Sequence, residues 1–265
     1  MFDESFTEAW ERRYGSKPIE EMRELSRFLA HRSVRRFSKE AVPESTVSAL
    51  VASAQSAATS SNLQLWSIVS IQDAARREQI AKIAADQHQI REAAWFFAFL
   101  ADHYRLREAG KRVEQDTSGL GFMEFFVMAA IDAALAAERM VCAAESLGLG
   151  ICYIGALRND PPAVKELLEL PDGVFALFGL CIGWPEEGAS FPIKPRLPQS
   201  SIWFRERYDK DVSVSEYDER MRDFYVSEGM KGEFTWSMRS ARRTSLLTGR
   251  EVIQEWLRKQ GFNLK

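Results

Sequence analysis

Cysteine and histidine are scarce in this chain, and those present are not spaced like metal ligands. The 265 residues include three of each, at Cys142, Cys152, Cys181, His31, His88 and His103. No CxxC or HExxH spacing occurs, so the sequence predicts no metal site. An odd number of cysteines in apolar surroundings is typical of reduced core thiols rather than disulfides. The Gly-x-Ser-x-Gly sequence is absent as well, which removes the clearest signal of a serine hydrolase.

An excess of positive charge and a long uninterrupted apolar run are also lacking. The formal net charge is −3 at pH 7, which argues against general nucleic-acid binding, because that binding needs clustered positive charge. Residues 1–4 begin no cationic region followed by an apolar run, so no secretory signal is predicted and the expected localisation is the cytoplasm. The longest apolar stretch, residues 121–147, is interrupted by Glu124, Asp132 and Glu138. These charges argue against a membrane span, so we expect neither a nucleic acid nor a membrane as partner.

Almost half of the residues, 46%, are hydrophobic, which is enough for one large domain or two modest ones. Apolar spacing and the positions of glycine and proline predict the secondary structure. Helices are expected over residues 3–14, 16–29, 43–54, 73–85 and 121–147, strands over 66–71, 95–101, 148–155 and 174–184, and charged helices over 201–265. Helix 121–147 is apolar nearly all round, so we expect it to be buried, and a subunit interface is one natural place for it.

Two short segments are rich in positively charged residues, although the chain as a whole has a negative net charge. Residues 31–37 read His-Arg-Ser-Val-Arg-Arg-Phe, and Lys194 and Arg196 alternate with prolines further along the chain. Arginine offers a planar fork of donors that suits a phosphate, and a donor-rich turn beside a helix end favours bound anions. The two segments together suggest a clamp for a phosphate-bearing ligand. Either segment alone also fits an ordinary solvated basic turn.

Residues 56–64 read Ser-Ala-Ala-Thr-Ser-Ser-Asn-Leu-Gln, so small hydroxyl and amide side chains replace large apolar ones. Such a segment lets a flat ligand approach the backbone and offers it several short donors and acceptors. It is a candidate wall for a heteroaromatic ring or a sugar-phosphate chain. A solvated loop between a helix and a strand would have the same composition.

Taken together, these stretches resemble the flavin-dependent nitroreductase family, and in particular its NADPH-preferring branch of oxygen-insensitive nitroreductases and flavin reductases. The motifs that carry the resemblance lie in residues 31–35, 58–64, 87, 153–159, 177–185 and 194–198. The resemblance implies an α+β sandwich around a mixed, mostly antiparallel sheet flanked by helices. It further implies an intertwined homodimer with one FMN per subunit at the dimer interface. The expected domains are an N-terminal helical extension (1–20), an FMN-binding core (21–200) and a helical C-terminal extension (201–265) that completes the fold and the dimer.

The resemblance also assigns roles to particular residues. It implies FMN binding by His31, Arg32, Ser33, Arg35, Thr59, Ser60, Ser61, Gln64, Gln87, Tyr153, Ile154, Gly155, Lys194 and Arg196. Arg35 is assigned to the pyrimidine edge, where it would tune the flavin, and the phosphate mainly to Lys194 and Arg196. No catalytic side chain is expected, because in flavoenzymes the cofactor carries the chemistry.

The electron donor implied by the resemblance is NADPH, with NADH left open. Candidates for holding the 2′-phosphate of NADPH are Lys231, Arg242, Arg243 and Arg250, whereas Glu228 lies where family members often have a basic residue. The implied activity is the reduction of nitroaromatics, quinones or free flavin by a ping-pong mechanism. The alternative is a non-catalytic sensor or carrier that binds FMN or another phosphate ligand. The sequence does not identify the physiological acceptor.

Overall fold

The protein is described here by a computed structural model, which covers residues 4–230, 232, 234–245 and 249–265. The chain divides into two compact units. Unit 1 is formed from residues 1–32 and 190–247, and unit 2 from residues 33–189 and 248–265. The three-part division expected from the sequence stays a prediction.

Unit 2 is built around an antiparallel sheet with the strand order β1-β2-β4-β3. The strands are β1 (Trp66–Ile71), β2 (Trp95–Asp102), β3 (Gly150–Ile154) and β4 (Val174–Gly183). An isolated parallel bridge between Ser33 and Ile151 adds the parallel component. Nearly every residue of β2 is buried, which agrees with its continuous apolar sequence and with a sheet covered on both faces. The predicted α+β sandwich is therefore confirmed.

The helices of unit 2 are α3 (Glu44–Gln55), α4 (Ala74–Ile83), α5 (Gln89–Glu92), α6 (Tyr104–Arg112), α7 (Met123–Ser146), α8 (Pro161–Leu167) and α11 (Ile253–Leu257). Of these, α7 and α8 pack directly against strands of the sheet. Local capping explains where some of them begin. The Asp73 carboxylate accepts the Arg76 N–H at 2.8 Å before α4, and Asp160 caps α8 next to Pro161 at its first position. The two aspartates accept backbone N–H groups at the helix ends, and proline has no N–H that needs a partner.

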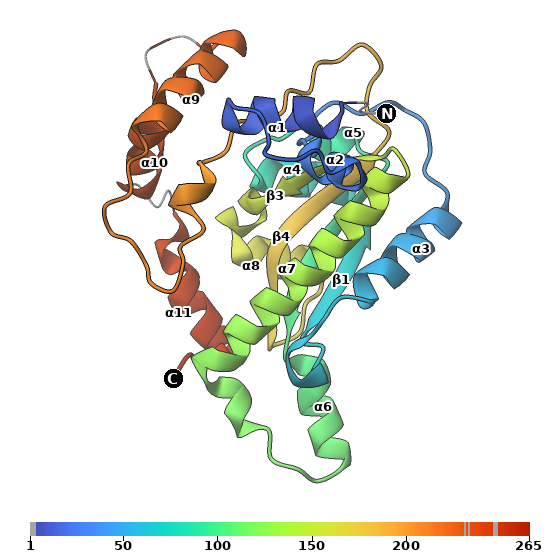
Figure 1. The fold of residues 1–265 in the computed structure, drawn as a ribbon. Helices are drawn as coiled ribbons and strands as arrows, with labels where there is room; N and C mark the ends of the chain where they lie inside the picture. Colours follow the sequence, from blue (N-terminus) through green and yellow to red (C-terminus); the bar gives the residue numbers. More distant parts are fainter. Residues whose placement is uncertain (1–3, 231, 233, 246–248) are drawn as a thin grey trace. The chain divides into compact units, whose positions relative to one another are not determined.

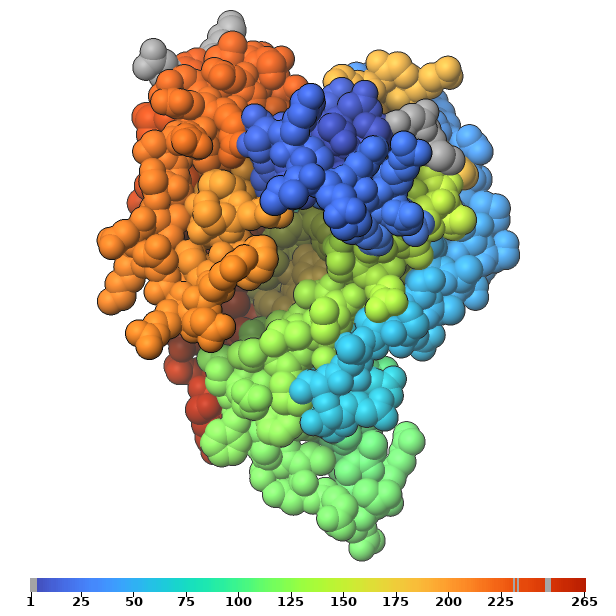
Figure 2. All heavy atoms as spheres, viewed as in Figure 1, coloured from blue at the N-terminus to red at the C-terminus, as the bar shows by residue number. Residues whose placement is uncertain are grey.

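The long helix α7 has two different faces. Ala129, Ala133, Ala136 and Ala137 are fully buried, and α7 lies against the sheet (Figure 1), because small side chains allow the backbones to approach closely. The other face carries four large apolar side chains that are 41–51% exposed, which we call the α7 ridge: Met123, Val127, Ile131 and Leu135. Figure 2 shows α7, in yellow-green, on the visible surface. The helix expected to be buried is thus buried on one face only within a single chain.

The segment around α11 completes the core of unit 2. Phe262 is fully buried and lies 4.7 Å from the ring of His103, centroid to centroid. The Gly173 N–H donates to the carbonyl oxygen of Gln260 at 2.7 Å. The core of unit 2 therefore combines residues from both of its stretches of sequence.

Unit 1 begins with α1 (Phe6–Tyr14), which ends at the predicted residue and begins three residues after the predicted start. Ser5 and Glu8 form a capping box at its N-terminus, and Gly15 ends it in the left-handed conformation with φ 71°, which glycine adopts without strain. Unit 1 also contains α9 (Ser215–Ser227) and α10 (Trp236–Ser245). Tyr217 of α9 packs edge-on against Trp236 of α10, with ring centroids 5.5 Å apart.

The helix predicted over residues 16–29 is wrong. This stretch holds only a 3₁₀ turn, Arg23–Leu25, and the single helical turn α2 (Ser26–Leu29). Met22, Leu25 and Phe28, whose apolar side chains have helical spacing, are 43–49% exposed. Without a packed partner, helical spacing of apolar residues does not stabilise so short a helix. Across the described residues, the structure has no helix of the length and apolar character needed to cross a bilayer.

Candidate functional site

Strand β3 fixes the second half of the basic turn within unit 2. The Val34 N–H donates to the carbonyl oxygen of Ile151 at 2.8 Å, and the Val34 side chain is fully buried. A Cβ atom at Gly150 would lie 2.6 Å from a methyl carbon of Val34. Val34 therefore packs directly on the backbone of Gly150, and any larger residue at position 150 would clash with it. Because successive side chains of an extended segment point to opposite sides, Ser33 and Arg35 are directed away from this contact.

Arg35 lies close enough to β3 to influence the Cys152 thiol. Burial raises the pKa of Cys152, while the positive charge of Arg35 and a hydrogen bond from Gln89 act in the opposite direction. The net shift is upward, so the thiol stays protonated at neutral pH. All three cysteines are free in the structure, where Cys152 and Cys181 are buried and Cys142 is partly exposed.

Gln87 belongs to the same group of residues. Its amide nitrogen donates to the Ala84 carbonyl oxygen at 2.9 Å, and its amide oxygen accepts from the Gln89 side chain at 2.7 Å. A hydrogen bond from the same Gln89 side chain lowers the pKa of Cys152, so Gln87 and Cys152 share Gln89 as a neighbour. Both ends of the Gln87 amide are engaged, so a ligand contact through it would replace one of these bonds.

Tyr153, Ile154 and Gly155 follow directly at the end of β3. The Tyr153 hydroxyl donates to a carboxylate oxygen of Glu138 on α7 at 3.2 Å, and its ring stands edge-on to Phe178 at 5.5 Å. Partial burial and the Glu138 charge raise the pKa of Tyr153, which keeps the phenol neutral. Ile154 is buried at 1% exposure, so it can offer a ligand little besides its backbone.

A buried carboxylate holds the hydroxyl-rich loop in place. Asp132 of α7 is 1% exposed and accepts the backbone N–H groups of Ser60 at 2.9 Å and Leu65 at 3.2 Å. Between these two anchors, Ser61, Asn62 and Gln64 have φ values of 50°, 55° and 52°. Non-glycine residues in this region cost free energy and often occur where backbone binds a ligand. The loop is therefore anchored at both ends and is not a freely solvated connection.

Asp132 is a residue whose role the sequence analysis missed. It was noted only as a charge that interrupts an apolar stretch. The available signal was its position among the alanines of α7, because a buried carboxylate needs hydrogen-bond donors from elsewhere in the fold. Thr59, Ser60, Ser61 and Gln64, the predicted ligands from this loop, stay predictions.

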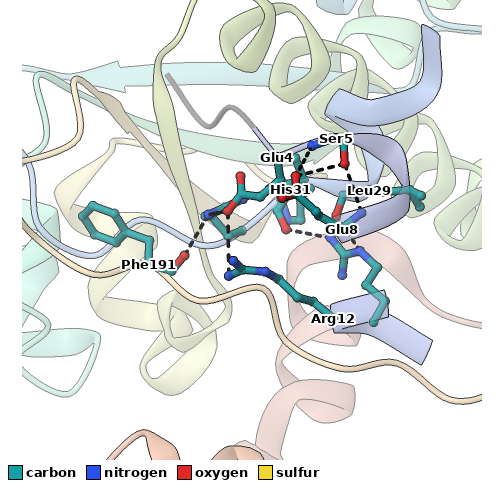
Figure 3. A network of polar contacts seen from close by, with 10 residues as sticks. Glu4, Ser5, Glu8, Arg12, Leu29, His31 and Phe191 are labelled. Carbon is teal, nitrogen blue, oxygen red and sulfur yellow. Dashed lines mark hydrogen bonds and ion pairs between the residues drawn. The ribbon is translucent and has the colours of Figure 1, made fainter. Parts of the chain in front are cut away.

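In unit 1, Arg32 forms a buried ion pair with Glu4. Figure 3 labels Glu4 and Phe191, two of its hydrogen-bond partners. Its side chain is 5% exposed and donates to both carboxylate oxygens of Glu4, at 2.9 and 2.6 Å. It also donates to the carbonyl oxygens of Ala30 and Phe191. Arg32 thus has a structural role of its own, and its contact with a ligand phosphate stays a prediction.

The first residue of the basic turn and the second basic segment meet at one side chain in unit 1. Arg13 of α1 donates to the carbonyl oxygens of His31 at 2.7 Å and Lys194 at 3.3 Å. The second segment is also held from α9, since Arg220 donates to the Arg196 carbonyl oxygen at 3.2 Å. Lys194 and Arg196 are exposed. The structure therefore brings together the two segments that the sequence suggested as a clamp.

The candidates for a 2′-phosphate site fall in different parts of the chain. Arg250, in unit 2, donates to the Asn159 side-chain oxygen at 3.0 and 2.8 Å. Arg242 and Arg243 lie in the last turn of α10 in unit 1, and Lys231 lies outside the described residues. Among the residues that are described, no group of three or more His, Cys, Asp or Glu side chains is arranged to hold a metal ion.

Two family models match most of the sequence. The model of the nitroreductase family covers residues 29–184, and that of the nitroreductase family C-terminal domain covers residues 194–265. The chain belongs to the nitroreductase family. Helix α1 lies before the first matched residue of this nitroreductase.

Relatives match this nitroreductase over nearly their whole length. It is 35% identical over 252 residues to FMN reductase (NADPH) of Bacillus subtilis, covering 90% of this chain and 98% of the relative. It is 37% identical over 235 residues to the oxygen-insensitive NADPH nitroreductase of Salmonella typhimurium, covering 88% and 95%. These relatives bear the two activities that the resemblance implied.

Solved structures of the family share the fold. The NfrA1 nitroreductase from B. subtilis has a TM-score of 0.85 at 34% identity, with 90% of this chain and 98% of that one covered. The NADPH:FMN oxidoreductase from Vibrio harveyi, complexed with NAD+, has a TM-score of 0.79 at 31% identity, with 89% and 97% covered.

Proposed function

We propose that this nitroreductase is an FMN-dependent oxidoreductase that uses NAD(P)H, preferably NADPH, to reduce nitroaromatics, quinones or free flavin. The observation that carries the proposal is the likeness to FMN reductase (NADPH), which the chain matches over 98% of that protein at 35% identity. The bound FMN would supply the redox chemistry, accepting a hydride and passing electrons on. We expect ping-pong kinetics, in which the oxidised nucleotide leaves before the acceptor binds.

The residues of each unit fit a flavin mononucleotide in different ways. In unit 1, His31, Lys194 and Arg196 are proposed to hold the phosphate, because side-chain donors on an anchored backbone suit an anion. In unit 2, Arg35 is proposed to lie at the pyrimidine edge. The remaining proposed contacts are Arg32, Ser33, Thr59, Ser60, Ser61, Gln64, Gln87, Tyr153, Ile154 and Gly155.

We propose a homodimer in the cytoplasm as the working form. The α7 ridge supports the dimer, because four large apolar side chains at spacings of four residues form a continuous exposed strip, and such patches mark interaction surfaces. A second copy of the chain is the proposed occupant.

The test is an anaerobic absorption spectrum of the purified protein, supplied with FMN, before and after NADPH is added. Flavin bands that bleach rapidly are the expected result. Bands that persist would favour the alternative of a carrier or sensor of FMN. A protein that binds no flavin at all would refute the proposed function and leave only a carrier or sensor of another phosphate ligand. Replacing NADPH by NADH in the same experiment measures the donor preference, which Glu228 leaves open.

A further inference from the structure

The N-terminal helix α1 holds the two basic segments of unit 1 together through one buried arginine. Arg13 is 4% exposed. Its guanidinium donates to three backbone carbonyl oxygens: from Nε to Leu29 at 2.7 Å, from one terminal nitrogen to His31 at 2.7 Å, and from the other to Lys194 at 3.3 Å. The guanidinium of Arg13 therefore links the backbone at the start of the first basic segment to the backbone of the second basic segment.

The main chain of Arg13 adds a fourth contact. The Arg196 N–H donates to the Arg13 carbonyl oxygen at 2.9 Å. Arg13 lies in the last turn of α1, where carbonyl oxygens have no partner within the helix. The second basic segment thus supplies the donor that the helix end lacks, and Lys194 and Arg196 are both tied to the same residue.

These contacts involve the backbone of the two segments. The Arg196 side chain itself donates to the carbonyl oxygens of Lys194 at 3.2 Å and Pro195 at 3.3 Å. Lys194 and Arg196 are exposed and His31 is partly so, whereas Arg13 itself is buried. A buried guanidinium needs acceptors for its donors, and carbonyl oxygens satisfy them without neutralising the charge. Arg13 is therefore placed to set the positions of the exposed cations and not to bind a ligand directly.

Helix α1 is not part of either family model. The models begin at residues 29 and 194, and Arg13 contacts Leu29 and Lys194, the residues at which they begin. A segment that precedes the matched sequence is thus hydrogen-bonded to the first residue of each matched stretch.

We infer that Arg13 is a positioning residue for phosphate recognition: it preorganises His31, Lys194 and Arg196 for the phosphate of FMN. This rests on the proposed function, namely that the chain binds FMN. Without the fork, the two segments must be ordered when the ligand binds, and ordering costs affinity. The effect should be confined to ligands that carry the phosphate.

The experiment compares FMN with riboflavin, which has the same ring system and no phosphate. Dissociation constants for both are measured by flavin fluorescence on flavin-free wild-type protein and on Arg13→Gln, Arg13→Lys and Arg12→Gln. Arg12 is the matched control, because it is the adjacent arginine of α1, its side chain is 56% exposed, and it lies 3.8 Å from Glu4. Thermal unfolding without flavin shows whether each variant is folded.

We expect Arg13→Gln to weaken FMN binding about ten- to a hundredfold, the equivalent of one or two lost contacts to charged groups. Riboflavin binding should change by less than about twofold, and Arg12→Gln should leave both constants unchanged. Arg13→Lys should stay impaired, because one ammonium group cannot serve three carbonyl oxygens in fork geometry. If Arg13→Gln does not fold, the comparison of FMN with riboflavin binding in Arg13→Lys still tests the inference.

Two results would overturn the inference. An unchanged ratio of the FMN and riboflavin dissociation constants in both Arg13 variants would show either a general structural role or no role. Full recovery in Arg13→Lys would show that charge alone suffices. Failure of the wild-type protein to bind FMN would instead refute the proposed function, which is a result distinct from all of these.

Discussion

Arg35 and the cations of unit 1 are proposed to act on opposite ends of the flavin. Arg35 lies beside Cys152 on β3, whereas the Lys194–Arg196 segment is bound to Arg13 and Arg220 in unit 1. A fixed positive charge at the pyrimidine edge favours the reduced, anionic flavin. A positive charge at the phosphate affects binding and leaves the reduction potential alone.

We therefore expect Arg35→Gln to lower the reduction potential of the bound flavin and to slow hydride acceptance, while most FMN stays bound. Arg196→Gln is the matched comparison and should chiefly weaken FMN binding, by roughly ten- to a hundredfold for one charge-assisted contact. The measurements are reduction potentials and FMN dissociation constants of both variants. If Arg35→Gln releases FMN while the residual flavin keeps the parent potential, the assignment of roles is wrong.

Asp132 offers a second prediction at the scale of single residues. Asp132→Asn keeps the shape of the side chain, but its NH₂ group cannot accept the N–H of Ser60 or Leu65. One buried donor then lacks an acceptor, which should cost roughly 1–3 kcal/mol of the free energy of unfolding. Asp223→Asn, at an exposed position of α9, is the matched control and should change stability by less than about 0.5 kcal/mol. Urea denaturation of the two variants provides the comparison, and equal values would contradict the anchoring role.

At the scale of elements, the attachment of α1 to the basic turn should depend on pH. Hydrogen bonds from Arg32 hold the pKa of Glu4 below its ordinary value of 4.5. A carboxylate whose pKa is lowered on folding stabilises the folded state fully above the unfolded pKa, and this contribution is lost as pH falls through the folded pKa. The loss should therefore occur below about pH 4.5.

The prediction is that wild-type stability falls more steeply below pH 4.5 than that of Glu4→Gln. At pH 7 the same substitution should destabilise by roughly 1–3 kcal/mol, because Arg32 keeps its charge while its partner becomes neutral. Denaturant unfolding at pH 7, 5, 4 and 3 gives both comparisons. Parallel pH profiles for the two proteins would show that the ion pair contributes nothing.

The sequence predicted correctly the helices and strands that depend on residues close together in the chain. Strand 66–71 and the helix that begins after Asp73 are confirmed, since alternation and capping are read within a few residues. The exposed Met22, Leu25 and Phe28 show why the helix over 16–29 failed: the pattern gives spacing but not whether a partner surface exists.

The supports of the site escaped prediction for the same reason. Arg13 binds the carbonyl of Lys194, and Asp132 binds the N–H of Ser60. Backbone groups carry no residue identity, and these partners lie 181 and 72 positions away along the chain. The motif residues themselves could be assigned by resemblance, whereas what holds them required the fold.

For the whole molecule, the α7 ridge predicts the oligomeric state. Ile131 is 51% exposed in the single chain, and Ile131→Asp would place a charge within the proposed dimer interface. We expect a dimer for the wild-type protein and a shift of at least tenfold towards monomer for the variant, since an unpaired buried charge is costly. Val226→Asp, at a 63% exposed position of α9, serves as the control. Light scattering after size exclusion at micromolar concentration gives the masses, and a monomeric wild-type protein would refute the dimer.

The strand order also has a consequence for synthesis on the ribosome. β4 is the last strand to be translated, yet it lies between β2 and β3, so β2 has an unpaired edge until residue 183 has emerged. Phe262 then fills the core beside His103, which was translated far earlier. The apolar surface around β2 therefore remains exposed during most of the translation of the chain. Such edges on a nascent chain are prone to wrong pairing. We therefore expect chaperones to bind this chain mainly before its last residues have been synthesised.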